Sequence, residues 1–265
     1  MNELKNLYRY RQLIATLTAR DLKARYRGSI LGFFWSLANP LLLLTVYTIV
    51  FTVFFPANAI QPQPYPLFLF AGILPWTFFA AATLESTAAI SANAGLIKKV
   101  MFPAEALPLV VVLSHLVHFA LAVPVLVIAT IGFALHGDIV MRPTMLLAVP
   151  LMVVQTLFVA GIAMTVSSAA VLFRDLRDII TNLLTLGFFL TPILYTVERI
   201  DSRWLRALLR INPMTPFVVA YQDVLFWGRL PALSDTFLML AYALASVSLG
   251  MTVFGRLRDT LAEAI

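Results

Sequence analysis

The chain has 265 residues, of which 61% are hydrophobic and 12% are charged, and its mean hydropathy is +0.90. A soluble domain carries about 25% charged residues, so this composition excludes an ordinary soluble protein and predicts an integral membrane protein. The absence of cysteine excludes disulfides and thiolate metal sites. The net charge of +6 comes from cations beside apolar runs, a pattern that favours membrane anchoring over nucleic-acid binding.

Residues 1–30 predict a cytoplasmic amphipathic helix that lies along the membrane surface, because apolar side chains are interspersed there with Lys and Arg. Such a helix can rest on the membrane, bind a partner, or do both. In residues 20–40, RDLKARYRGSILGFFWSLANP, four cations are followed along the chain by Gly28, Gly32 and an aromatic stretch. Aromatic side chains favour the headgroup level, so this stretch predicts the hinge at which the chain enters the bilayer.

Six apolar segments follow, each near or above the roughly 20 residues that a bilayer requires. They are placed at 31–55, 67–93, 105–135, 143–172, 179–197 and 235–255. Pro40, Pro75, Pro124 and Pro150 interrupt four of them, and membrane helices tolerate such prolines, often with a kink. The sequence therefore predicts one all-α membrane domain over residues 1–265, with six transmembrane helices.

The charges of the connecting segments predict that both termini lie in the cytoplasm. In this topology the cytoplasmic parts are residues 1–30, 94–104, 173–178 and 256–265. They hold most of the 19 Lys and Arg residues, including every Lys. This distribution follows the positive-inside rule, although several Arg residues remain in the external connections.

Residues 198–234 are too polar for a seventh span and too apolar for a plain loop. A helix at 202–210, with Trp and Leu on one face and Arg on the other, is followed by an Asn-Pro turn signal. Thr215 is expected to N-cap a second helix with Pro216 at its first position, and Gly228 is expected to end it. The sequence thus predicts two short re-entrant helices that dip into the outer leaflet before the last span.

Six motifs along the chain carry a family resemblance. They are DLKARYRGSILGFFWSLANP at 21–40, FLFAGILPWTFF at 68–79, NAGLIKKVMFPAEALPL at 93–109, LFRDLRD at 172–178, LTPILY at 190–195 and INPMTP at 211–216. In this order and spacing, the chain resembles the type 2 ABC-transporter permeases that export bacterial polysaccharides, including O-antigen, teichoic acid and capsule.

The resemblance implies a homodimer of six-span subunits in the bacterial inner membrane, with two separate ATPase subunits docked in the cytoplasm. ATP and Mg would bind to those partners and drive a lipid-linked glycan such as O-antigen outward, as in lipopolysaccharide biosynthesis. This chain is then a transport subunit in contact with membrane lipids, neither an enzyme nor a nucleic-acid binder, and it holds no cofactor of its own. The sequence itself supports one of these implications. It has no GxxxxGK[ST] phosphate loop, so the ATPase is expected to be another chain.

The turn NAGLIKKVMFP, at 93–103, is where the resemblance places the helix that couples the permease to its ATPase. A simple charged hairpin would not need this turn's apolar side chains to face water, which favours the coupling role. The candidate coupling residues are Asn93, Leu96, Ile97, Lys98, Lys99, Val100 and Met101.

Lys23, Arg25 and Arg27 lie just before the point at which the chain enters the bilayer. A lipid-linked glycan presents its pyrophosphate at headgroup depth, and Arg binds phosphate oxygens in a bidentate manner, so the three residues are candidates for a phosphate-binding gate. Ordinary attraction to anionic headgroups is the open alternative.

Glu85 is the only acid well inside an apolar span, so it is expected to face the bundle interior or a wet cavity, or to be protonated. A single carboxylate suits a structural or gating role better than a proton path. His115 and His118 share one helix face, but the nearest acids in the sequence lie at opposite ends of their span. We therefore expect a polar pair with satisfied hydrogen bonds, and no metal site.

The chain is rich in aromatic residues, with 20 Phe, 8 Tyr and 4 Trp. Aromatic faces suit the C–H faces of sugars, although most Phe residues in membrane helices contact lipid or pack internally. Spans one and five line the channel in the family that the chain resembles, and their aromatic residues give the channel candidates Trp35, Tyr47, Phe188, Phe189 and Tyr195.

Three other functions compete with polysaccharide export. A type 2 ABC permease for small-molecule, drug or lipid efflux would give no reason for the paired re-entrant helices or the basic N-terminal helix. A membrane enzyme acting on polyprenyl-linked sugars would need acid clusters or DxD-like motifs, and a secondary transporter would need internal repeats and several buried ionisable groups. The sequence does not choose among O-antigen, teichoic acid and capsule.

Overall fold

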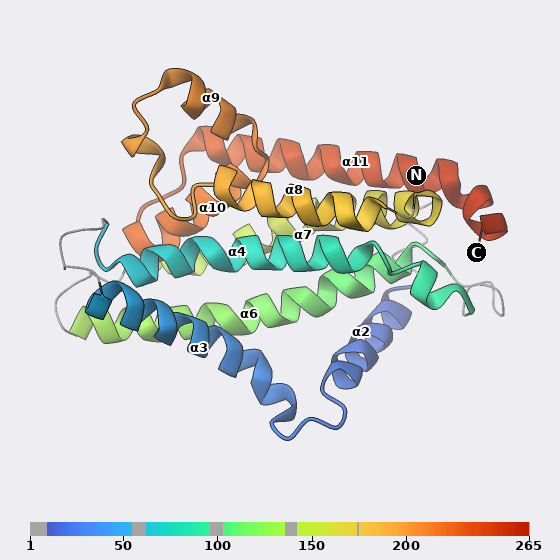
Figure 1. Cartoon of the computed structure of the whole chain (residues 1–265), viewed down its shortest axis with the longest axis horizontal. Coiled ribbons are helices and arrows are strands. Elements are labelled where there is room, and N and C mark those ends of the chain that lie inside the picture. The colour runs from blue at the N-terminus through green and yellow to red at the C-terminus, as the bar shows by residue number, and fades with distance from the viewer. Residues whose placement is uncertain (1–9, 55–61, 96–102, 136–141, 174, 265) are drawn as a thin grey trace.

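The computed structural model describes residues 10–54, 62–95, 103–135, 142–173 and 175–264, with the side chains of 199 and 258–264 left aside. Throughout these residues the chain forms helices and turns without a β-strand, which confirms the all-α prediction (Figure 1). The helices are α2 (Arg11–Arg25), α3 (Trp35–Ile49), α4 (Tyr65–Ser86), α6 (Ala106–Leu135), α7 (Ala148–Leu172), α8 (Leu176–Leu190), α9 (Arg203–Ile211), α10 (Met214–Gln222) and α11 (Leu233–Ala264). Short 3-10 or π-helical segments occupy Gly32–Phe34, Val50–Phe54, Ser91–Asn93, Pro143–Leu147, Val197–Arg199 and Asp223–Trp227.

Five stretches of the described chain are long and apolar enough to cross a bilayer. They are Gly32–Phe54, Tyr65–Ser86, Ala106–Leu135, Pro143–Leu172 and Leu233–Leu257, and they match the predicted first to fourth and last spans. The predicted fifth span, 179–197, corresponds to α8, which has 15 residues and ends at Leu190. Pro192 follows closely and cannot donate a backbone hydrogen bond, which explains the early end of this helix. The count of six spans therefore stays a prediction.

The second span also ends earlier than the predicted residue 93. The hydroxyl of Ser86 donates to the carbonyl of Ala82 at 2.7 Å, and that of Thr87 donates to Leu84 at 2.7 Å. Hydroxyl groups that bond to nearby carbonyls compete with the helical ladder, and α4 gives way here to turns.

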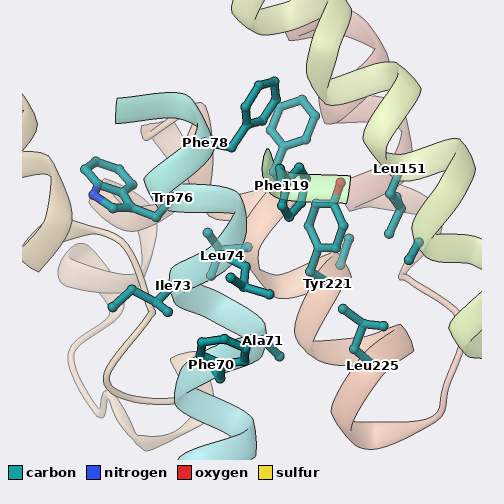
Figure 2. Close-up of a cluster of buried hydrophobic side chains, with 14 of the residues drawn as sticks. Phe70, Ala71, Ile73, Leu74, Trp76, Phe78, Phe119, Leu151, Tyr221 and Leu225 are labelled. Atoms are coloured by element: carbon teal, nitrogen blue, oxygen red, sulfur yellow. The ribbon is translucent and has the colours of Figure 1, made fainter. Parts of the chain in front are cut away.

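Helix α4 lies at the centre of the bundle. In the most apolar part of this helix 72% of the residues are buried, against 6% for the span that contains α3. Figure 2 shows α4 side chains packed with Phe119 of α6, Leu151 of α7 and Tyr221 of α10. The rings of Phe78 and Phe119 stack at 5.3 Å between centroids, and Phe119 meets Tyr221 edge to face at 5.5 Å. The core therefore ties three spans to the short helix α10.

Helices α7 and α11 cross at two glycines. A Cβ added at Gly161 would overlap the backbone of Ser246, and one added at Gly250 would overlap the backbone of Gly161. Small residues allow helix backbones to approach closely, which is a common basis of packing in membranes.

The outer faces of α3 and α8 carry large apolar side chains without cover in this single chain. Leu41, Leu42 and Val46 of α3 are exposed, as are Leu183, Leu186 and Phe189 of α8. The two helices lie on opposite sides of α4 (Figure 1).

Two short helices, α9 and α10, do form within residues 198–234. The second ends at Gln222 and continues into the π-helical segment Asp223–Trp227, which Gly228 ends with φ of +62°. The prediction that Thr215 caps α10, with Pro216 at its first position, is wrong. The helix begins at Met214, because the side-chain oxygen of Asn212 accepts the backbone N–H of Met214 at 3.0 Å. The Asn side chain thus makes the turn, and Thr215 lies inside the helix.

Candidate functional site

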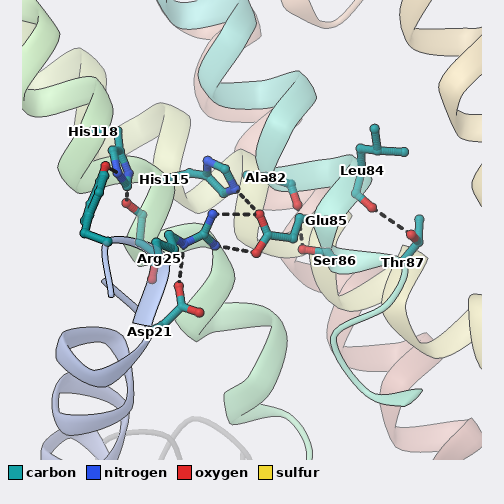
Figure 3. A network of polar contacts seen from close by, with 11 residues as sticks. Asp21, Arg25, Ala82, Leu84, Glu85, Ser86, Thr87, His115 and His118 are labelled. Carbon is teal, nitrogen blue, oxygen red and sulfur yellow. Dashed lines mark hydrogen bonds and ion pairs between the residues drawn. The ribbon is translucent and has the colours of Figure 1, made fainter. Parts of the chain in front are cut away.

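A polar cluster joins α2 to the last turn of α4 and to α6, with Glu85 at its centre (Figure 3). Nη1 of Arg25 donates to Oε2 of Glu85 at 3.0 Å, and Nη2 pairs with Oε1. Nε of Arg25 donates to Oδ2 of Asp21 at 2.8 Å, and Nε2 of His115 donates to Oε2 of Glu85 at 2.7 Å. One guanidinium therefore bridges two carboxylates, and one carboxylate joins three helices.

This cluster is only partly shielded from solvent. The exposed fraction of the side chain is 25% for Arg25, 41% for Glu85 and 15% for His115. Burial lowers the pKa of Arg25, but the hydrogen bonds and charges of Glu85 and Asp21 outweigh it, so the pKa is raised. The sequence predicts that Glu85 faces the bundle interior or a wet cavity, or is protonated. Its side chain is partly exposed and has Arg25 and His115 as partners, the compensation that an acid in a span needs.

A second hydrogen-bonded chain runs beside the first. Nδ1 of His118 contacts the carbonyl oxygen of Ser114 at 2.8 Å, and a carbonyl can only accept, so Nδ1 carries a proton. In neutral His118, Nε2 then accepts from the hydroxyl of Tyr26, and the Tyr26 oxygen accepts from Ser36 at 2.6 Å. As predicted, both histidines have polar partners. Tyr26 links the end of α2 to α6 and α3.

A cavity of about 370 Å³ opens between α3, α4 and α6, next to the cluster. His115 and His118 line it, together with Trp35, Ser36 and apolar side chains of the three helices. His115 and His118 therefore contact Glu85 and Tyr26 and also line a space in the bundle.

The structure separates the three cations of the predicted phosphate gate. Lys23 and Arg27 are exposed, whereas the guanidinium of Arg25 is committed to Glu85 and Asp21. Lys23 and Arg27 are consequently better placed than Arg25 to meet a lipid phosphate, and the gate itself stays a prediction.

Of the predicted coupling residues, only Asn93 lies within the described part of the chain. It is exposed at the end of the 3-10 turn Ser91–Asn93, and its side-chain amide donates to the carbonyl of Ala89 at 2.8 Å. Leu96, Ile97, Lys98, Lys99, Val100 and Met101 lie outside the described residues.

The channel candidates fall into two groups. The ring centroid of Phe188 lies 6.1 Å from that of Trp76 and 5.3 Å from that of Phe189. The hydroxyl of Tyr195 donates to the carbonyl of Phe189 at 3.0 Å. Trp35 and Tyr47 belong to α3, on the other side of α4. One copy of the chain thus does not bring the five aromatic residues to a common surface.

Sequence reasoning missed Asp21, Tyr26 and Ser36 as members of the cluster. The spacing of Asp21 and Arg25, four residues apart on a helix, could have indicated their ion pair. The contact of Tyr26 with His118 depends on how α2 packs against α6 and leaves no local signal. Within the described residues no group of three or more His, Asp or Glu side chains could hold a metal ion.

Comparison with known proteins adds to this geometry. A family described as ABC-2 type transporter matches residues 12–226. The O-antigen export system permease protein RfbA of Myxococcus xanthus is 35% identical over 265 residues, which cover 99% of this chain and 98% of that protein. A protein of the same name from Klebsiella pneumoniae is 30% identical, with coverage of 96% and 95%. The polysialic acid transport protein KpsM of Escherichia coli is 20% identical, with coverage of 91% and 92%.

Proposed function

The chain belongs to the ABC-2 type transporter family, and from this premise we propose that it is the membrane permease of an ATP-driven exporter of bacterial polysaccharide. The observation that carries the proposal is the similarity to an O-antigen export permease, which extends through 99% of this chain at 35% identity. The substrate is a lipid-linked, O-antigen-like glycan that moves from the cytoplasm across the inner membrane.

The alternative is a type 2 permease for small molecules, drugs or lipids. It is less well supported, because the relatives described above are named for O-antigen or polysialic acid, and the similarity to them covers more than nine-tenths of this chain.

The energy for export comes from a separate ATPase that binds ATP and Mg. The absence of a phosphate loop from the sequence supports this division of labour. The turn that starts at Asn93 contacts the ATPase, and both termini share the cytoplasmic side with it. Glu85, the centre of the polar cluster, lies in the last turn of α4, the helix that precedes this turn. An ATPase that moves the turn therefore also moves Glu85 and, through its bonds to Arg25, helix α2.

Two copies of the chain form the channel. The uncovered apolar faces of α3 and α8 support this arrangement, because a second copy can bring α3 of one subunit near α8 of the other. Trp35, Tyr47, Phe188, Phe189 and Tyr195 would then approach a shared path for the glycan.

The exposed cations at the end of α2 receive the substrate. Lys23 and Arg27 bind the pyrophosphate of the lipid-linked glycan at headgroup depth, since Arg offers paired donors to phosphate oxygens. Arg25 positions α2 against the spanning helices through Glu85 and Asp21.

Complementation tests the proposed function. Deletion of the gene is expected to remove the polysaccharide from the cell surface and to leave the lipid-linked precursor inside, measured by surface immunolabelling and lipid extraction. The full chain should restore surface display only when the ATPase gene is present. Unchanged surface polysaccharide in the deletion strain would reject the proposal.

A further inference from the structure

A second cavity is lined in part by α9, and α9 and α2 lie on opposite sides of the bundle (Figure 1). Its volume is about 300 Å³, and α9, α10, the segment Asp223–Trp227 and the start of α11 surround it. The polar residues of its wall include Glu198, Arg210, Thr215, Gln222, Asp223, Arg229, Ser234 and Asp235. None of them takes part in the cluster around Glu85.

Thr215 gives the first indication that this cavity holds a ligand. The residue is 5% exposed, it lines the cavity, and its hydroxyl has no hydrogen-bond partner among the described residues. A buried hydroxyl without a partner is costly, and most buried polar groups in proteins are paired. Its oxygen is covered by surrounding atoms, so a small movement of the cavity wall would be needed before a ligand hydroxyl supplied the missing partner.

Another part of the cavity wall contains an ion pair. Nε of Arg229 donates to Oδ1 of Asp223 at 2.7 Å, and the backbone N–H of Arg229 donates to the Asp223 carbonyl at 2.9 Å. The guanidinium lies 5.6 Å from the centre of the Trp227 ring, which is 41% exposed. An indole, a cation and a carboxylate are therefore fixed side by side before any ligand arrives.

The remaining polar groups are also anchored. The side-chain amide of Gln222 donates to the carbonyl of Pro192 at 3.0 Å, which fixes the orientation of its oxygen. Burial raises the pKa of Asp223 against the opposing effect of Arg229, and the charges of Asp235 and Glu198 raise it further. These three carboxylates therefore act on one another across the same space.

The chemistry of this lining matches a sugar ring. Sugar hydroxyls both donate and accept, so they suit carboxylates, guanidinium groups, an amide and a free hydroxyl together, while the C–H faces of the ring suit an indole. The volume is at the lower end of the about 300–1,000 Å³ typical of ligand pockets, which fits one sugar residue and not a polymer. Three described carboxylates face two described guanidinium groups, which disfavours an acidic sugar.

We propose that this cavity is a subsite for one neutral sugar residue of the exported glycan. The proposal rests on the function proposed above and adds to it a contact between the permease and the glycan chain. A metal ion fits less well, because the described carboxylates of the cavity do not come together as a group that could hold one.

The natural absence of cysteine makes a direct test possible. The substitution Ser234→Cys places a single thiol in the cavity wall, and Ala207→Cys places one on the exposed surface of α9, outside the cavity, as a control. Each full chain is purified with its ATPase in lipid nanodiscs and labelled with N-ethylmaleimide. The probe is the glycan released by mild acid from the surface of the source bacterium.

The glycan should slow labelling at position 234 in a saturable manner and leave labelling at position 207 unchanged. Adding Thr215→Val, which removes the hydroxyl with little change of shape, should weaken this protection by about threefold to tenfold, the effect of one hydrogen bond. Asp235→Asn is a second variant of unchanged shape with the same expected direction. A neutral methyl hexoside should compete with the glycan better than a methyl uronide.

Two outcomes separate the subsite from the export function. If the chain restores surface polysaccharide in cells but the glycan fails to protect position 234, the subsite is rejected and the export function stands. If Thr215→Val and Asp235→Asn both leave protection unchanged, the assigned contacts are wrong. A chain that fails to restore surface polysaccharide at normal protein levels rejects the export function itself, whatever the labelling shows.

Discussion

At the scale of single residues, the carboxylate of Glu85 accepts hydrogen bonds from α2 and from α6, so its charge decides how firmly α2 is held. Glu85→Gln keeps the shape but removes the negative charge that Arg25 and His115 face. We expect the free energy of unfolding to fall by about 1–2 kcal/mol, less than for a fully buried pair, because water reaches this side chain. The apparent melting temperature in detergent should fall, whereas Asp201→Asn, at an exposed position, should leave it unchanged. Equal melting temperatures for both variants would contradict a stabilising role of the cluster.

The second prediction at this scale concerns the phosphate gate. Both Arg25→Lys and Arg27→Lys keep the charge, but the first also disturbs the bonds to Glu85 and Asp21. Arg27→Lys is therefore the cleaner test, and we expect it to lower export by roughly tenfold, the effect of losing one charge-assisted hydrogen bond to phosphate. Export is measured as the rate at which new glycan appears at the surface.

Arg20→Lys, at another exposed position of α2, serves as the matched control and should export normally. Normal export by Arg27→Lys at normal protein levels would favour simple attraction to anionic headgroups, which needs charge and not geometry.

The sequence identified Glu85 but not all of its partners, and the reason is physical. A lone acid in an apolar span is conspicuous because it is costly there. Its partner Arg25 is 60 residues away in sequence, and their contact depends on the angle at which α2 meets α4 and α6. Gly28 and Gly32, with φ of +79° and +51°, help to set that angle, and no local pattern specifies it.

At the scale of helices, the crossing of α7 and α11 depends on the absence of a side chain at Gly161. Gly161→Ala forces a Cβ into the backbone at Ser246, so the two helices must separate. We expect the free energy of unfolding to fall by about 1–3 kcal/mol, the usual cost of overpacking. In Gly132→Ala the added Cβ meets nothing within 4 Å, and helical propensity predicts a gain of ~0.5–1 kcal/mol. The measurement is thermal unfolding of both variants in one detergent. Equal stability would show that α7 and α11 accommodate the added methyl group without loss of stability.

The coupling turn gives the next prediction. Ile97→Asp combined with Val100→Asp should release the ATPase or uncouple it, because a charge at an apolar contact is poorly solvated. The measurement is co-purification of the ATPase together with glycan export. Ser91→Asp, at an exposed position before the same turn and outside the coupling candidates, is the control for added charge alone. Unchanged binding and export in the double variant would place the coupling contact elsewhere.

The existence of most helices was predictable, whereas several of their ends were not. Hydropathy located the five stretches that can cross a bilayer, because a bilayer demands a long apolar run. The ends of α4 and α10 depend on side-chain hydrogen bonds of Ser86, Thr87 and Asn212, which compete with backbone bonds. Thr215 and Asn212 are both good capping residues, and only the fold decides between them.

At the scale of the whole molecule, a single copy leaves α3 and α8 apolar and uncovered on opposite sides of α4. Lipid can cover either face, but a glycan needs a path shielded from lipid, and one copy does not bring the aromatic candidates of the two helices together. The sequence indicated these two helices only through its family resemblance, because hydropathy does not distinguish a lipid-facing side chain from one that faces a second subunit.

The final prediction therefore tests where the second copy binds. A cysteine at Leu42 of α3 is combined in the same chain with one at Leu183, Leu186 or Phe189 of α8, or with Ile128→Cys of α6 as the control, and all these positions are exposed in one copy. A short bis-maleimide should join two chains more strongly in at least one α8 pair than in the control pair, as measured by electrophoresis of membranes. Cross-linking requires the two thiols to come within the reagent's length, so random encounters in the bilayer would affect all four pairs alike. Equal yields in the control and in the α8 pairs would reject the contact between α3 of one subunit and α8 of the other.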